Sequence, residues 1–188
     1  MHMHGVTRVI LLLFAVSIAN VAGAQGVGLE GTMGAYLERP GGESIKIADV
    51  TFTPGDGGYT FSVTMTEAPF GDEFLSMRPF KCIDGETMYC HLVYPYDKKN
   101  TGTSDQHINL EYEFLFIVRS PKDYGINPYN GRYFVLQQEG ASLRGKVHAV
   151  DLDILAAPPD AGVVHPITAA DLDELEPAPE RFPELVIR

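Results

Sequence analysis

The sequence predicts an all-β fold of about eight antiparallel strands that form a closed barrel, with a two-sheet β-sandwich as the alternative. Three observations support this prediction. Apolar and polar residues alternate with a period of two, between turn signals, from residue 28 to residue 155. Two long strands change phase, as strands of bent sheets do. No stretch between residues 25 and 157 keeps a helical period.

The predicted strands follow from this alternation. It is clearest at residues 59–66, where Tyr59 and Phe61 share one face and Thr60 and Ser62 the other. The segment 44–53 changes phase, and a bulge near Ala48-Asp49 would restore its facing; the segment 143–155 changes phase in the same way. The eight predicted strands are residues 28–37, 44–53, 59–66, 73–82, 87–94, 110–118, 131–138 and 143–155.

An eight-stranded antiparallel barrel with a short C-terminal helix is similar in general plan to lipocalin-like proteins. The Gly-x-Trp of the first lipocalin strand is missing, because the chain has no tryptophan. Neither Gly28-Leu29-Glu30 nor Gly31-Thr32-Met33 replaces it. The resemblance implies a closed barrel, which removes exposed strand edges, and it implies no family membership.

The N-terminus predicts export. In residues 1–24, Arg8 is the one formally charged side chain, an apolar run covers residues 9–19, and Ala22-Gly23-Ala24 fits a signal-peptidase site. The run is shorter than the roughly 20 residues of a membrane-spanning helix, so an uncleaved anchor is the weaker alternative. We expect cleavage before Gln25, no transmembrane segment after cleavage, and a periplasmic or secreted protein.

The two cysteines predict a disulfide. Cys82 and Cys90 bracket a segment that contains Asp84-Gly85, a strong signal for a tight turn. In an oxidising compartment, a bond across this hairpin is expected. A redox role is the alternative, but catalytic cysteine pairs usually stand two residues apart at a helix start.

The composition divides the exported chain into a β-barrel domain at residues 25–157 and a Pro-rich acidic tail at residues 158–188. The tail holds six of the thirteen prolines and seven acidic residues against two basic ones. Thr168 and Asp171 predict a short helix, which Pro177 would end. The apolar end of the chain, residues 182–187, is expected to dock on its own sheet; pairing with a partner's strand is the alternative.

Several functions are disfavoured. A net charge of -11 offers no basic surface for nucleic acid or anionic lipid. No nucleophile elbow or phosphate-binding loop is present, so we assign no catalytic residue and no cofactor. The four histidines after residue 24 lack ligand spacing, so we assign no metal. Asp151 and Asp153 could bridge calcium, although a solvated strand face with Leu152 pointing inward is the preferred interpretation.

The segment 119–133 is the predicted recognition loop. It holds three tyrosines, two asparagines, two arginines and a lysine between two apolar strands, and such residues on fixed loops suit binding. The alternative is ordinary turn chemistry at Asn127-Pro128 and Asn130-Gly131. The predicted ligand-binding residues are Tyr124, Asn127, Tyr129 and Arg132.

These observations favour an exported, non-enzymatic binding protein for a small, partly apolar ligand, held in the barrel interior or at a mouth formed by the loop. The second hypothesis is an envelope structural or interaction protein that engages a protein partner through its loops or acidic tail. The third is a hydrolase or isomerase of unrecognised type, which a pocket with strongly perturbed titratable groups would support.

Overall fold

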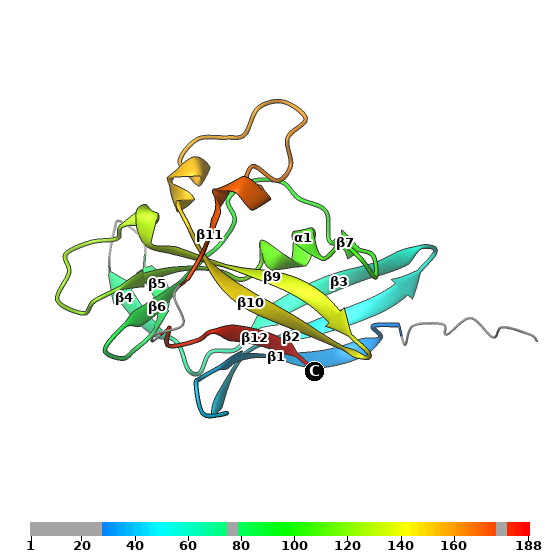
Figure 1. Cartoon of the computed structure of the whole chain (residues 1–188), viewed down its shortest axis with the longest axis horizontal. Helices are drawn as coiled ribbons and strands as arrows, with labels where there is room; N and C mark the ends of the chain where they lie inside the picture. The colour runs from blue at the N-terminus through cyan, green and yellow to red at the C-terminus, as the bar shows by residue number, and fades with distance from the viewer. Residues whose placement is uncertain (1–27, 75–78, 176–179) are drawn as a thin grey trace, which may run out of the picture.

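The computed structural model describes residues 28–74, 79–175 and 180–188, so the predicted signal segment 1–24 lies outside the described residues. The described chain is all-β and forms one antiparallel sheet of twelve strands (Figure 1). The elements are β1 (Gly31–Glu38), β2 (Ser44–Gly55), β3 (Gly58–Met65), β4 (Gly71–Phe74), β5 (Pro79–Ile83), β6 (Met88–Leu92), β7 (Thr101–Gly102), α1 (Ile108–Glu111), β8 (Leu115–Arg119), η1 (Pro128–Asn130), β9 (Gly131–Glu139), β10 (Ser142–Val150), η2 (Leu152–Leu155), η3 (Ala169–Asp171), β11 (Leu172–Glu174) and β12 (Glu184–Ile187).

The sheet is open, so the predicted closed barrel is wrong and a bent sheet replaces it. The strand order is β4-β5-β6-β8-β9-β10-β12-β1-β2-β3-β7, with β11 paired to β10 and no pairing between β4 and β7 in the described residues. The helical turn α1 contacts both β7 and β9. It therefore lies between these two strands, which do not pair with each other in the described residues. The end strands are short, which limits the unpaired backbone that an open sheet exposes.

Three predicted strands differ from the structure. The segment 73–82 contains two strands, β4 and β5, and Pro79, which has no N–H to donate, begins the second. The segment 110–118 begins with α1, and Leu110 and Phe114 are both buried in one cluster at helical spacing. The segment 143–155 ends as η2, because the chain leaves the sheet after Val150.

The two phase changes have different causes. In β2, Ala48 pairs with Ala35 while Lys46 pairs with Tyr36, so Ile47 is an extra residue and the predicted bulge is one residue away. In β10 the register with β9 is continuous. There Leu143 and Val147 pack into one cluster and Val150 into another, so the buried face changes along a regular strand.

The C-terminal segment docks on its own sheet, as expected, and it does so in the middle. Strand β12 pairs with β10 on one side and with β1 on the other. Leu185 and Ile187 are fully buried. The helix predicted after Thr168 is the single turn η3, which carries the expected capping box between Thr168 and Asp171.

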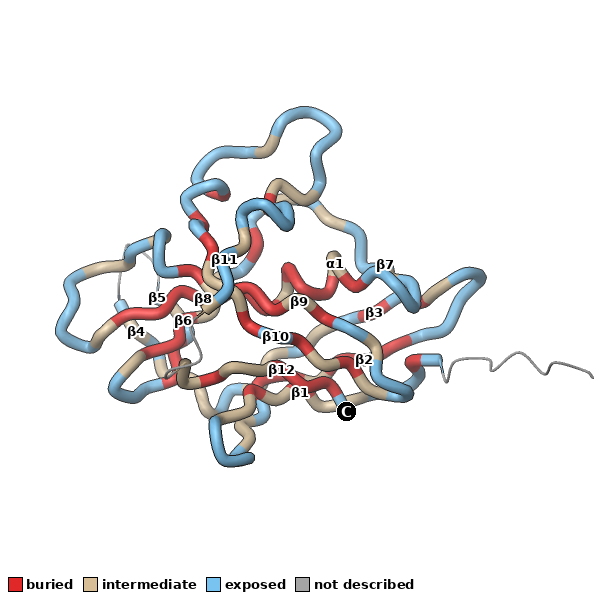
Figure 2. The backbone as a smooth tube through the Cα atoms, viewed as in Figure 1, coloured by how far each residue is buried: buried red, intermediate tan, exposed pale blue. Residues whose placement is uncertain are grey.

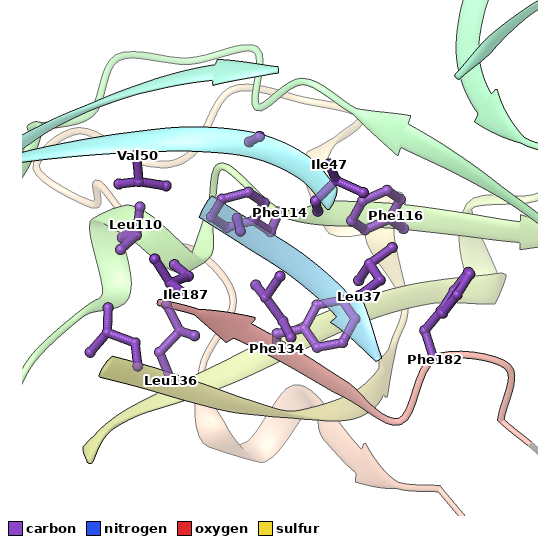
Figure 3. Close-up of a cluster of buried hydrophobic side chains, with 14 of the residues drawn as sticks. Leu37, Ile47, Val50, Leu110, Phe114, Phe116, Phe134, Leu136, Phe182 and Ile187 are labelled. Carbon is purple, nitrogen blue, oxygen red and sulfur yellow. The ribbon is translucent and has the colours of Figure 1, made fainter. Parts of the chain in front are cut away.

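Large side chains fill the space that the bent sheet encloses. Figure 3 shows Leu37, Ile47, Phe116 and Phe134 gathered in one cluster, with β1, β2 and β8 around them. A second cluster lies on the other face, where the segment after β10 and its loop cover Tyr112 and Tyr133. Figure 2 shows the contrast between buried strands and the exposed loop that follows η2. Of the aromatic residues that the structure describes, seven are fully buried: Phe52, Tyr89, Tyr112, Phe114, Phe116, Phe134 and Phe182.

The described residues contain no helix that is both long and apolar enough to cross a membrane.

Candidate functional site

The four predicted ligand-binding residues do not form one site. The Asn127 side chain accepts a hydrogen bond from the Tyr129 N–H at 3.1 Å and so caps η1. Arg132 is paired with Glu180 at 2.8 Å, and both side chains are largely buried. Tyr129 is exposed and Tyr124 is fully exposed. Of the four, Tyr124 lines a surface hollow.

This hollow, which we call the Arg119 hollow, has a volume of about 570 Å³. It lies between β4, the turn that joins β5 to β6, and the loop after β8. Three of its residues are acidic, two are aromatic and two are buried: Glu73, Phe74, Asp84, Met88, Arg119, Asp123 and Tyr124. Its volume falls within the roughly 300–1,000 Å³ that small-molecule sites occupy.

Arg119 is the unusual group in this lining. Arg119 is the last residue of β8 and pairs with Met88 of β6, and it is 8% exposed. One guanidinium nitrogen, Nη2, donates to the Asp123 carbonyl oxygen, and the buried Nε has no hydrogen-bond partner. In the described part of the chain no carboxylate forms an ion pair with Arg119. Burying a cation without an ionic partner is costly, and an incoming acceptor would offset that cost.

Two exposed aromatic rings stand at the same hollow. Phe74 is 78% exposed at the end of the edge strand β4, and Tyr124 is on the loop after β8. A ligand that covers these rings removes their apolar surface from water, which favours binding. The sequence does not indicate Phe74 as a candidate site residue, because residues 73–82 have the pattern of one regular strand.

The turn that forms one wall of the hollow is fixed from two sides. The predicted disulfide Cys82–Cys90 is present and joins β5 to β6, and both cysteines are fully buried. Arg181 donates from Nη1 to the Thr87 carbonyl at 2.6 Å and from Nη2 to the Asp84 carbonyl at 2.6 Å. A Cβ atom at Gly85 would lie 2.6 Å from Arg181 Nη1, so a larger residue there would displace the guanidinium. The C-terminal segment therefore holds this wall in place.

Two pairs of buried residues with shifted pKa values lie away from the hollow. The carboxylate of Glu111 accepts from the Tyr133 hydroxyl at 2.5 Å and from the Leu136 N–H at 2.7 Å, and burial raises the pKa of Glu111. The Tyr59 hydroxyl lies 2.6 Å from His107 Nδ1; burial raises the pKa of Tyr59 and lowers that of His107. All four residues are buried, and Tyr59 also lines two further surface hollows.

The Asp151 and Asp153 side chains do not lie on a strand. Asp151 caps η2 by accepting from the Asp153 N–H at 2.8 Å, while Leu152 points inward as expected. A shallow surface hollow is lined by four aspartates: Asp151, Asp153, Asp171 and Asp173. Within residues 28–74, 79–175 and 180–188, no group of three or more potential ligands is arranged to hold a metal ion.

Comparison of the chain with protein-family models, with curated proteins and with solved structures finds no match.

Proposed function

We propose that the protein is an exported, non-enzymatic binding protein that takes a small, partly apolar ligand in the Arg119 hollow. The observation that carries the proposal is the juxtaposition of two exposed aromatic rings with a buried guanidinium that has no ionic partner among the described residues. A ligand there would accept hydrogen bonds from Arg119 while its apolar part covers Phe74 and Tyr124.

Packing supports a surface site over an interior one. The side chains of Phe114, Phe116 and Phe134 are fully buried and occupy the space inside the bent sheet (Figure 3). Tertiary packing of this density leaves few voids larger than a water molecule. A ligand in the interior would have to displace these rings.

The proposed location is periplasmic or secreted. The signal-like residues 1–24 support it on the sequence side. The disulfide supports it on the structural side, because such bonds persist in oxidising compartments.

A binding assay with three tyrosine and phenylalanine variants tests the proposal. Small aromatic acids are titrated against the purified protein, with amide chemical shifts as the readout. Phe74→Ala and Tyr124→Ala should each weaken binding about tenfold, since truncating an aromatic anchor costs on the order of 1–2 kcal/mol. Both side chains are exposed, so the melting temperature should stay unchanged.

Tyr129→Ala is the matched control, because Tyr129 is also an exposed tyrosine after β8 but does not line the hollow. It should bind as the wild type does. Equal loss in Tyr129→Ala and Tyr124→Ala, or shifts confined to residues outside the hollow, would contradict the proposal.

A further inference from the structure

The charges around the Arg119 hollow indicate more about its ligand than its apolar rim does. Among the described residues, the lining carries one cation, Arg119, and three carboxylates, those of Glu73, Asp84 and Asp123. A purely anionic ligand would meet Arg119 at the cost of repulsion from the carboxylates. A purely cationic ligand would leave the buried guanidinium unpaired.

The three carboxylates are not equally available. Asp123 Oδ2 accepts a hydrogen bond from the Ser120 N–H at 3.0 Å and so holds its own loop. The Asp84 carboxylate interacts electrostatically with the Arg181 guanidinium. Glu73 forms no ion pair among the described residues, so it is the carboxylate best able to pair with a ligand cation.

We infer that the ligand of the Arg119 hollow is a zwitterion of the amino-acid or short-peptide kind, with its carboxylate on Arg119, its ammonium group on the Glu73 side, and an apolar side chain against Phe74 and Tyr124. This inference rests on the proposed function. The guanidinium has five N–H donors in a planar fork that suits a carboxylate, and it has one acceptor in the described chain. The zwitterion satisfies both signs of charge at once.

The size of the hollow allows either source of this chemistry. A volume of about 570 Å³ accommodates a single amino acid with room to spare, and it also accommodates a dipeptide. Both carry an ammonium group, a carboxylate and an apolar skeleton, so the experiment must separate them.

Calorimetric titration of the whole protein with four probes tests the inference. The probes are L-phenylalanine, the dipeptide phenylalanyl-phenylalanine, 3-phenylpropionate, which lacks the ammonium group, and 2-phenylethylamine, which lacks the carboxylate. The tighter of the two zwitterions should bind at least about tenfold more strongly than either single-charge probe, because the loss of one charge-assisted hydrogen bond has about that effect. Which zwitterion binds more tightly identifies the source.

Two variants connect the charges to their partners. Glu73→Gln should weaken binding of the zwitterion about tenfold, and it should leave binding of 3-phenylpropionate equal or tighter, because it removes a carboxylate that repels this anion. Asp72→Asn is the matched control, since Asp72 is the neighbouring acid on β4, pairs with Lys81 at 2.7 Å and does not line the hollow. It should bind every probe as the wild type does.

The failures are distinguishable. If 3-phenylpropionate or 2-phenylethylamine binds as tightly as the zwitterions, or if Glu73→Gln and Asp72→Asn behave alike, the zwitterion inference is overturned while the proposed binding function stands. If no probe binds at the hollow, as judged by amide shifts of residues 119–125, both are overturned.

Discussion

Replacement of Glu111 by alanine should be among the most damaging single changes to a polar residue of this chain. Strand β9 pairs with β8 at Gly131 and Arg132 and then loses this neighbour, because the chain before β8 is the turn α1. Further along β9, the Glu111 carboxylate takes the place of a neighbouring strand by accepting from the Leu136 N–H at 2.7 Å. It also accepts from the Tyr133 hydroxyl at 2.5 Å.

The expected loss follows from the two donors that Glu111→Ala leaves buried. Each unsatisfied buried donor costs about 1–3 kcal/mol, so the free energy of unfolding should fall by about 2–6 kcal/mol. Glu111→Gln keeps the shape of the side chain. Its amide oxygen can accept from Leu136 N–H and its amide nitrogen can donate to the Tyr133 oxygen, so the loss should stay within about 1.5 kcal/mol.

Urea unfolding followed by circular dichroism measures both variants. Glu113→Ala is the control, since Glu113 is two residues away but its pair with Lys98 at 2.5 Å is partly solvated. It should cost about 1 kcal/mol or less. A loss in Glu111→Ala no larger than in Glu113→Ala, or an equal loss in Glu111→Gln, would refute the role of the carboxylate as a substitute for a strand.

Three further outcomes follow from the structure. Burial raises the pKa of Glu111 above its ordinary value of 4.5. The wild type should therefore lose stability relative to Glu111→Gln as pH rises from about 4 through the folded-state pKa. If the urea midpoints of the two proteins differ by the same amount at pH 4 and at pH 8, this expectation is wrong. Arg181→Ala should cost about 1.5–3 kcal/mol and speed amide exchange in the β5–β6 turn, and unchanged exchange there would contradict the contacts of Arg181 with the turn carbonyls. Gly131→Ala should cost about 1–3 kcal/mol, since its Cβ would lie 2.5 Å from Leu152 Cγ and from the Val150 carbonyl oxygen, whereas Gly55→Ala meets open space and should change the melting temperature little; equal effects would exclude the clash.

The fold class and the hairpin were readable from local pattern. The predicted segments 44–53 and 59–66 agree with β2 and β3 to within two residues at each end. The spacing of Cys82 and Cys90 around Asp84-Gly85 predicted the disulfide. Both depend on neighbours in sequence, for which period and turn chemistry are direct evidence.

The candidate site was readable only in part. The loop after β8 was identified as a recognition loop, and Tyr124 does line the hollow. The sequence also predicts Arg132 as a ligand-binding residue, but Arg132 forms an ion pair with Glu180 from the C-terminal segment. Whether an arginine is free to meet a ligand depends on which distant carboxylate reaches it, and no local pattern carries that information.

The sequence by itself determined the alternating strands, the short turn after Thr168 and the covalent hairpin, because each arises from interactions within about a dozen residues. The tertiary structure decided that the sheet stays open and that α1 lies between β7 and β9. It also placed the C-terminal strand between β1 and β10, where Arg181 can hold one wall of the Arg119 hollow. The physical reason is that strand order and the pairing of buried charges are settled by long-range packing, where an apolar segment such as 185–187 gains most by completing the sheet's core.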